Sequence, residues 1–160
     1  MMLTIVRISE ETRPFVTAQI IESWGAELVV SRGVSHDTRM LDGFAAIADG
    51  AVAGYALYNI VENDCELVVL EALNSGHGIG SALIDEVLIA AKENGCRRVW
   101  LITTNDNTSA IRFYQRFGFD LREVHINAME QARLLKPQIP MLGNDDIPIK
   151  HEFEFEIMLS

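Results

Sequence analysis

Hydrophobic and polar positions alternate strictly along residues 151–159, "HEFEFEIML", near the end of the chain. This period of two predicts a strand with apolar side chains on one face and Glu152, Glu154 and Glu156 on the other. We expect the glutamate face to be solvated. The alternative is that one of these acids helps to recognise a cationic acceptor molecule.

The first half of the chain predicts a strand, a helix and an antiparallel meander. Residues 3–8 are β-branched, and residues 13–25 have a proline near the start, apolar positions at helical spacing and a glycine at the end. Residues 27–41 are ambiguous and predict a short strand followed by a loop. Three apolar runs separated by short turns then predict the meander, at 43–50, 51–61 and 65–73.

After residue 80 the hydrophobic pattern becomes helical and then alternates between helix and strand. In order, it predicts a helix, a strand, a helix, a strand and a helix, at 81–95, 97–104, 108–119, 120–127 and 128–136. The segment 136–150 has three of the four prolines and no periodicity, and it predicts a loop. We therefore expect one α/β domain that spans residues 1–160.

Charge and composition exclude several classes of protein. The formal net charge of −10 argues against nucleic-acid binding, which needs a basic stripe. It suits a cationic small-molecule partner, or it merely keeps the protein soluble. No apolar run reaches the roughly 18 residues that a membrane span needs, and the N-terminus has no signal-peptide pattern. We expect no membrane association.

The cysteines and histidines do not predict a metal site. Cys65 and Cys96 fit no metal or redox spacing, so we expect reduced cysteines in the core of a cytoplasmic protein. No ligand spacing relates His36, His125 and His151, and we expect no bound metal.

Glycines at every second position, Gly76, Gly78 and Gly80, run into the helix predicted at 81–95. Unpaired N–H groups at a helix N-terminus bind anions, and glycines let the ligand approach the backbone. The loop therefore predicts a phosphate or pyrophosphate site. It does not match the dinucleotide fingerprint, because the third glycine comes one residue too early and no acid lies about 20 residues further on. The Gly-Lys-Ser/Thr ending of a Walker loop is also missing.

A second motif follows in residues 105–119, "NDNTSAIRFYQRFGF". It has the form N-x-x-A-x-x-F-Y-x-x-x-G-F, made by Asn107, Ala110, Phe113, Tyr114, Gly118 and Phe119. Together with "GHGIGSALI", it closely resembles the GNAT superfamily of acetyl-CoA-dependent N-acetyltransferases, over residues 44–119. The resemblance implies a mixed, mostly antiparallel central sheet of about six to seven strands, flanked by helices.

The resemblance also implies which residues contact coenzyme A. The amides of the glycine loop would bind its pyrophosphate, at Gly76, His77, Gly78, Ile79, Gly80 and Ser81. The strand before the loop would pair through its backbone with the pantetheine arm, at Val68, Val69 and Leu70. Asn107 would hold the pantetheine, and Ala110 and Phe113 belong to the same motif. In one departure, Ser75 stands ahead of the glycines where the family usually has Arg or Gln. The backbone amides would then bind the phosphate alone or with help from Arg112 or Arg116.

Acetyl transfer needs a neutral amine, donors for the oxyanion and a proton for the departing thiolate. The family position of Tyr114 implies that it protonates the thiolate, and a backbone amide near Val69 would serve the oxyanion. Glu66 is our first candidate for the base and Glu71 the second; deprotonation in bulk water or by another residue stays open. Glu66 and Glu71 would face opposite sides of a regular strand, but a bulge, which the family leads us to expect there, would alter that.

The sequence thus predicts an N-acetyltransferase that moves the acetyl group of acetyl-CoA to a primary amine of a small molecule or an N-terminus. The transfer would be direct, in a ternary complex. The alternative is a non-catalytic acyl-CoA-binding or regulatory module of the same fold. The resemblance places the acceptor site at residues 20–40 and 136–150, where no motif names the acceptor. A homodimer is an expectation from the family alone.

Overall fold

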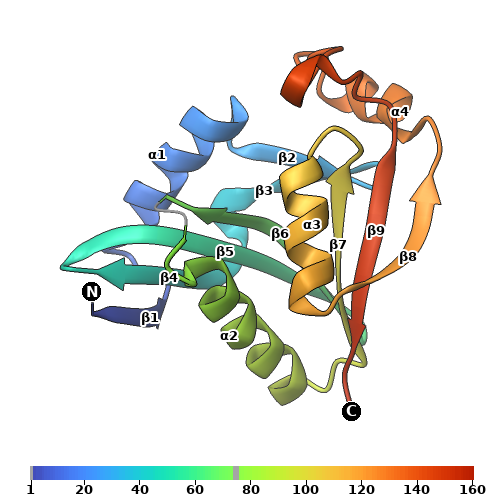
Figure 1. Cartoon of the computed structure of the whole chain (residues 1–160). Coiled ribbons are helices and arrows are strands. Elements are labelled where there is room, and N and C mark those ends of the chain that lie inside the picture. The colour runs from blue at the N-terminus through green and yellow to red at the C-terminus, as the bar shows by residue number, and fades with distance from the viewer. Residues whose placement is uncertain (1, 74–75) are drawn as a thin grey trace.

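A seven-stranded sheet organises the chain (Figure 1). The computed structural model describes residues 2–73 and 76–160. The strands of the sheet are β1 (Leu3–Arg7), β4 (Asp42–Ala48), β5 (Ala51–Val61), β6 (Asp64–Ala72), β7 (Arg98–Thr104), β8 (Asp120–His125) and β9 (Glu152–Met158). Their order is β1-β4-β5-β6-β7-β9-β8, and only the β6–β7 pair is parallel. The expectation of a mixed, mostly antiparallel sheet is confirmed.

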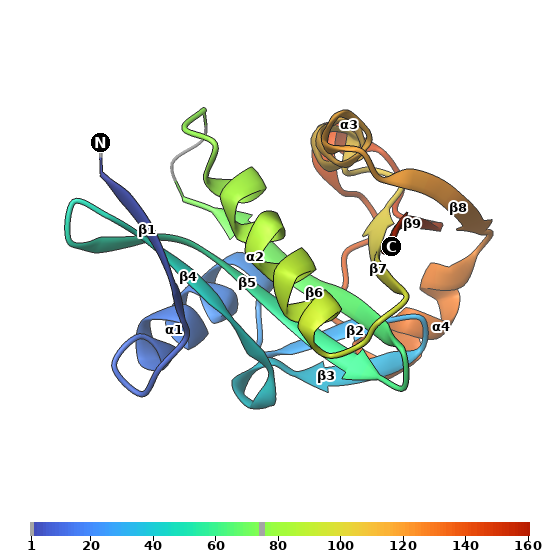
Figure 2. The ribbon, with the colours of Figure 1, turned by 90° about the horizontal axis from the view of Figure 1, so that it is seen from below.

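Helices and a small hairpin cover the two faces of this sheet. The helices are α1 (Arg13–Trp24), α2 (Ile79–Glu93), α3 (Thr108–Phe117) and α4 (Ala128–Leu135), and the hairpin is β2 (Leu28–Ser31) with β3 (Val34–Asp37). Figure 2 shows α2 and α3 on one side of the sheet, with α1 and the hairpin on the other. Helix α4 contacts β2 on the hairpin side.

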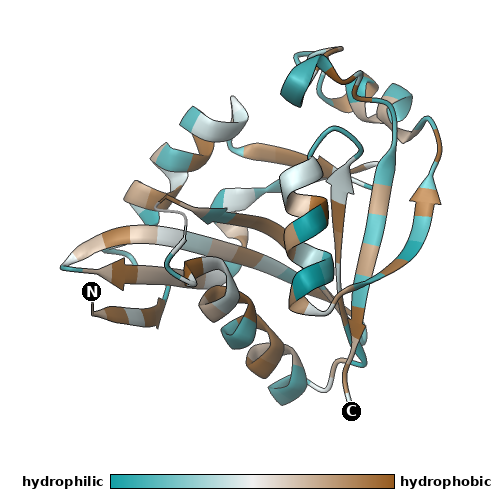
Figure 3. Cartoon of the chain, viewed as in Figure 1, coloured by the Kyte–Doolittle hydropathy of each residue, from teal (hydrophilic) through white to brown (hydrophobic). Residues whose placement is uncertain are grey.

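Two apolar layers hold the helices to the sheet. On one face, Leu83, Ile84 and Val87 of α2 are completely buried against the central strands. On the other face, Val16 and Ile20 of α1 pack on the sheet. Hydrophobic residues dominate the central strands, whereas α2 and β9 carry both kinds of residue (Figure 3). Because the central strands are covered on both faces, they need apolar side chains on both.

Glycines end two of the helices where the sequence predicts an end. Gly25 follows α1 with φ 83°, and its N–H donates to the carbonyl of Ile21. Gly118 follows α3 with φ 127° and donates to the carbonyl of Tyr114. Both glycines take positive φ values that side chains disfavour, which makes them effective stop signals. Helix α2 begins at Ile79, ahead of the predicted start at residue 81.

The hairpin β2–β3 corrects our interpretation of residues 27–41. We expect a short strand and a loop there, but the structure has two paired strands and a short 3-10 turn, η1 (Thr38–Met40). Arg32 and Gly33 connect the strands with φ values of 47° and 73°. Two central residues with positive φ are what a tight hairpin turn requires. The strands are too short for their alternation to stand out in the sequence.

The glutamate face of β9 corrects a second expectation, because it is not solvated. Glu152 is 3% exposed and Glu154 is 9% exposed. Arg32 of the hairpin turn pairs with Glu152, and Arg98 of β7 pairs with Glu154. Alternation identifies two faces of a strand but does not show which neighbours cover each face.

The segment 136–150 follows the prediction of a loop. It contains a single 3-10 turn, η2 (Asn144–Asp146), and one isolated bridge between Leu142 and Pro148. Over the parts of the chain that the structure describes, we find no helix with both the length and the apolar character for crossing a bilayer.

Candidate active site

Strands β6 and β7 pair only at one end and then separate, which opens the sheet. Their parallel register covers Asp64–Glu66 against Arg98–Trp100. Further along, β6 pairs with β5 alone. The β5–β6 register passes from Tyr58↔Leu67 to Leu57↔Val69, so Val68 is an extra residue in β6. Such a bulge bends its strand and increases the local twist, which accounts for the separation of β6 from β7.

The bulge also decides which way the two candidate bases point. Glu66 accepts a hydrogen bond from Ser31 of β2, and Glu71 accepts one from Ser23 of α1. Both partners lie on the α1 side of the sheet, so the two carboxylates share that face. A regular strand would have placed them on opposite faces, and the extra Val68 reverses this.

A cavity of about 170 Å³ lies between the separated strands. Five residues that the sequence predicts as site residues line it: Val68, Leu70, Asn107, Ala110 and Tyr114. Trp24 and Met129 close it from the α1 and α4 side. The structure therefore brings together the β6 residues and the α3 motif. The side chain of Val69, also a predicted contact, is buried against α1, so only its backbone remains for a ligand.

Tyr114 lies in α3 within a cluster of aromatic rings. Its ring centroid is 5.4 Å from that of Phe113 and 5.5 Å from that of Phe119. Burial raises the pKa of the Tyr114 hydroxyl above its ordinary value. The hydroxyl therefore stays protonated at neutral pH and can act as a hydrogen-bond donor to a developing anion.

Asn107 has a structural role as well as its predicted one. It is the N-cap of α3, and its side-chain oxygen accepts a hydrogen bond of 3.3 Å from the amide of Ala110. The carboxamide nitrogen cannot accept from the helix, so it remains a donor at the cavity wall.

Asp106, next to Asn107, is a buried residue that sequence reasoning missed. It is 4% exposed and accepts hydrogen bonds from the Thr104 hydroxyl at 2.5 Å and the Asn144 amide at 3.0 Å. A side chain at Gly143 would collide with this carboxylate. Asp106 thus ties the β7–α3 connection to the segment 136–150.

The glycine loop ends at an N-terminus with free amides. Gly78 is the N-cap of α2 in a left-handed conformation, φ 71°, and no side chain of the described residues caps the helix. Gly76 also has positive φ, 85°, and a Cβ at either position would meet no atom within 4 Å. The amides of Ile79, Gly80 and Ser81 occupy the first turn, whose N–H groups have no partner within the helix. This arrangement suits an anion.

Two of the predicted loop residues, Ile79 and Gly80, have a packing role toward the core and α3. A Cβ at Gly80 would lie 3.1 Å from the Phe113 ring, so this glycine allows α3 to approach α2. The side chain of Ile79 is buried in the core, whereas His77 is exposed. Ser75, the departure from the family pattern, lies outside the residues that the structure describes.

A hollow of about 400 Å³ lies beside this helix N-terminus, between α2 and α3. Ser81 of α2 lines it together with Arg112 and Arg116 of α3. Two arginines next to free helix amides make this the side of the molecule that suits a phosphate-bearing ligand. Arg112 and Arg116 thus lie close enough to the α2 N-terminus to contact a phosphate bound there.

Glu66 lies where β6 and β7 part, on the hairpin side of the sheet. It is 6% exposed, and the Ser31 hydroxyl donates to its Oε2 at 2.6 Å. His36 Nε2 lies 3.5 Å from its Oε1. A second cavity of about 300 Å³ is lined by His36 and Glu66, and Ser31 lines both this cavity and the first.

Ser31 and His36 were not among the predicted site residues. Both belong to the hairpin that the sequence analysis leaves ambiguous, and the Gly33 turn within "VVSRGVSH" was the available signal. Of the two predicted acceptor segments, 20–40 lines both cavities, whereas 136–150 contributes no residue to the lining of either one.

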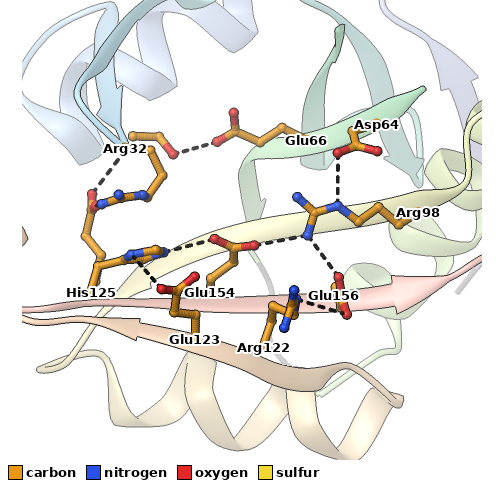
Figure 4. A network of polar contacts seen from close by, with 11 residues as sticks. Arg32, Asp64, Glu66, Arg98, Arg122, Glu123, His125, Glu154 and Glu156 are labelled. Carbon is orange, nitrogen blue, oxygen red and sulfur yellow. Dashed lines mark hydrogen bonds and ion pairs between the residues drawn. The ribbon is translucent and has the colours of Figure 1, made fainter. Parts of the chain in front are cut away.

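Below Glu66, a network of charged side chains crosses β6, β7, β9 and β8 (Figure 4). Arg98 is its centre and pairs with Asp64, Glu154 and Glu156. Burial alone would raise the pKa of Glu154, but hydrogen bonds from His125 and Arg98 outweigh it and hold that pKa below its ordinary value. Hydrogen bonds from Arg97 lower the pKa of Asp64, with Arg98 adding to the effect.

One part of this network has the residue types of a metal site. Glu123, His125 and Glu154 place ligand atoms within 4.8 Å of one another. Arg98 already donates to Glu154 at 3.0 Å, so a cation there would meet a competing positive charge. This arrangement belongs to the ion-pair network, and nothing at it points to a ligand.

The family profile described as "Acetyltransferase (GNAT) family" matches residues 8–119. The protein YdhI of Bacillus subtilis is 39% identical over 156 residues, which cover 96% of this chain and 97% of that protein. An IAA acetyltransferase structure from Bacillus cereus superposes with a TM-score of 0.75 at 18% identity, over 99% of this chain and 100% of that one.

A GNAT family acetyltransferase from Elizabethkingia anophelis, solved with acetyl-CoA bound, has a TM-score of 0.70 at 16% identity and covers 98% of both chains. These likenesses in structure support the fold, and the profile match over residues 8–119 shows the family. Splayed strands, free helix amides and both sequence motifs occur here in one site, and the chain belongs to the GNAT acetyltransferase family.

Proposed function

We propose that this protein transfers the acetyl group of acetyl-CoA to a primary amine of a small molecule or an N-terminus. The observation that carries the proposal is the cavity between β6 and β7, which has Asn107 and Tyr114 on its wall and the Ser31–Glu66 pair at its hairpin side. A related fold from Elizabethkingia anophelis holds acetyl-CoA.

The cofactor would lie across both groups of predicted binding residues. Its pyrophosphate would accept hydrogen bonds from the amides of residues 76–81, with Arg112 and Arg116 nearby. The pantetheine arm would pair with the side of β6 that faces away from β5, at Val68 to Leu70, because β7 has left that side open. The carboxamide of Asn107 would donate to it.

The chemistry would then proceed in a ternary complex. Glu66 removes a proton from the acceptor ammonium, and the neutral amine attacks the thioester carbonyl. A backbone amide near Val69 stabilises the oxyanion, and the C–S bond breaks as the carbonyl re-forms. Tyr114, which its raised pKa keeps protonated, donates a hydrogen bond to the departing thiolate. The attacking nitrogen loses its extra proton as the amide forms, and the thiolate takes up that proton to leave as the CoA thiol.

Glu66 is a better candidate for the base than Glu71. Neither carboxylate lines this cavity, and each accepts a hydrogen bond from a serine, but the partner of Glu66, Ser31, lines the cavity, whereas the partner of Glu71, Ser23, does not. The hairpin and the end of α1 would hold the acceptor, since both contribute to the cavity walls. The acidic balance of the chain favours an acceptor with positive charge.

A thiol-release assay with acetyl-CoA and a panel of small amines and peptide N-termini tests this function. We expect saturable turnover on at least one amine, abolished by acetylating that amine beforehand. Binding of acetyl-CoA without turnover on any amine would instead favour a non-catalytic acyl-CoA-binding module of the same fold.

A further inference from the structure

His36 has a buried nitrogen that no described hydrogen bond satisfies. Its side chain is 8% exposed, and Nε2 has no hydrogen-bond partner among the residues that the structure describes. This nitrogen faces Glu66 Oε1 at 3.5 Å. Leaving a buried polar atom unpaired is costly, so such an atom in a folded protein calls for an explanation.

The neighbouring carboxylate has one oxygen occupied and one directed at this histidine. Ser31 donates to Oε2 of Glu66 at 2.6 Å, which leaves Oε1 on the side of His36. Both residues line the cavity of about 300 Å³ under the hairpin, which also has Asn59 and Trp100 on its walls. That volume holds several water molecules beside two polar groups.

Three further charged groups line the same cavity. Arg32 pairs with Glu152, and Asp64 pairs with Arg97 and Arg98, so both have partners elsewhere. Glu62 is exposed at the β5–β6 turn. The charged group in closest contact with His36 is therefore Glu66.

We propose that His36 is a positioning residue that acts through Glu66, as the second group of a relay that carries the acceptor's proton to water in this cavity. The inference rests on the proposed function. The acceptor ammonium loses one proton to Glu66, which becomes a neutral acid. Glu66 then passes that proton to His36 Nε2, so the carboxylate is restored and the imidazole becomes an imidazolium. The imidazolium releases a proton to water, and exchange with solvent resets the neutral ring.

The relay would return Glu66 to its ionised form after each turnover. A carboxyl group that is 6% exposed must lose its proton before the next turnover, and the imidazole that faces its Oε1 gives this proton a nearby acceptor. A neutral imidazole is ordinarily a stronger base than a carboxylate, so an imidazole that faces the carboxylate is the residue type that such a relay needs.

Two variants and a control test the relay. His36→Gln keeps a polar side chain of similar size but does not take up protons, and His36→Ala leaves space beside the cavity. We expect kcat to fall about 10-fold or more in both, with the KM for acetyl-CoA unchanged, because general acid–base groups contribute roughly 10² to 10⁴ in rate. Ser35→Ala, on the same strand but exposed, should keep wild-type kcat.

A readout beyond loss of rate separates a relay from a structural role. Added imidazole should restore kcat to His36→Ala in proportion to its neutral form, whereas His36→Gln has no space for it and should not respond. The decline of kcat with falling pH should shift in His36→Gln, because protonation of His36 no longer blocks the step. Wild-type kcat in His36→Ala, or no rescue in a variant that folds normally, would overturn the relay while acetyl transfer itself stands.

An NMR titration covers the case in which the wild-type protein turns over no amine. We expect the titration of the His36 ring to move in Glu66→Gln, since the neutral amide removes the facing charge. An unchanged titration would overturn the coupling between His36 and Glu66. The absence of any wild-type turnover would count against the proposed function instead.

Discussion

Single residues at this site have two structural tasks each, which makes their substitutions informative. Tyr114 supplies a hydroxyl to the cavity and a ring to the aromatic cluster beneath it. Asn107 supplies a donor to the cavity and an acceptor to the α3 N-terminus. A useful substitution removes one task and keeps the other.

Tyr114→Phe removes only the hydroxyl and keeps the ring packing. If Tyr114 donates to the departing thiolate, kcat should fall about 10²-fold or more, while the affinity for acetyl-CoA changes little. Steady-state kinetics and a binding titration on the same sample measure the two quantities. Equal kcat in the variant would remove Tyr114 from the mechanism.

Asn107 permits a matched comparison of two variants. Asn107→Asp keeps the oxygen that caps α3 and replaces the donor nitrogen, so we expect near-normal stability and weaker acetyl-CoA binding. Asn107→Ala removes both, and should also lower the free energy of unfolding by about 1 kcal/mol. Urea unfolding and cofactor titration separate the effects. Wild-type affinity in Asn107→Asp would contradict the assigned contact with the pantetheine.

Residue-level prediction depends on local signals. Tyr114 and Asn107 belong to one contiguous motif and both line the cavity, and their roles in the reaction stay predictions. Ser31 and His36 were missed because they reach Glu66 from a hairpin that lies 35 and 30 residues before it in the chain. Nothing in their own neighbourhood in the sequence records that contact.

At the scale of elements, two strand features shape the site. The bulge at Val68 separates β6 from β7 and turns Glu66 and Glu71 to one face. The hairpin β2–β3 then covers that face and closes the cavity beside Glu66. The bulge was an expectation from the family, whereas the hairpin's position depends on contacts with β5 and β6 that the pattern of residues 27–41 does not encode.

Strand β9 also shows what a local sequence pattern does not predict. Its alternation predicts the strand and the two faces correctly, but its glutamates are buried beneath Arg98 and Arg32. These arginines come from β7 and from the hairpin turn. Whether an acidic face is solvated or paired depends on such distant partners, and a single strand's sequence does not reveal them.

The Arg98 network should govern the stability of the sheet in acid. The pKa values of Asp64 and Glu154 lie below their ordinary values of 3.8 and 4.5. As the pH falls, the unfolded state therefore takes up protons at a higher pH than the folded state does. The stabilisation that these carboxylates provide is complete at pH values above their ordinary pKa values. It is lost as the pH falls below about 4.5 and through the lower folded-state pKa values.

Arg98→Met should remove this stabilisation at neutral pH. We expect the free energy of unfolding at pH 7 to fall by about 3 kcal/mol, because buried carboxylates lose their partner. The variant should also lose less stability than the wild type between pH 5 and pH 3.5, as measured by urea unfolding. Arg97→Met is the comparison, since Arg97 is 68% exposed and pairs with Asp64, so its removal should cost less at pH 7 than the loss of Arg98. Equal losses in the two variants would contradict the central position of Arg98.

At the scale of the whole molecule, the sheet separates two kinds of surface. The α2–α3 side has the free helix amides with Arg112 and Arg116, and the opposite side has the hairpin with Glu66. In a chain with a net charge of −10, the arginine pair is a local exception beside the predicted pyrophosphate position. The cavity between β6 and β7 connects the two sides, so a cofactor and an amine would meet there from opposite faces.

The global arrangement was the most predictable part. The two motifs carried the family resemblance, and with it the mixed, mostly antiparallel sheet. The sequence does not identify the acceptor, because the residues of the hairpin that line the cavity form no motif linked to a known substrate. The residues that form the cavity walls come together only when the chain folds.

Calorimetric titration of acetyl-CoA into the protein tests the central claim most directly, because the glycine loop, the α3 motif and the separated strands all converge on this ligand. We predict saturable heat for one site per chain with a dissociation constant between about 1 µM and 1 mM, the usual range for enzyme substrates. No heat and no displacement of a bound analogue at millimolar acetyl-CoA would contradict the account.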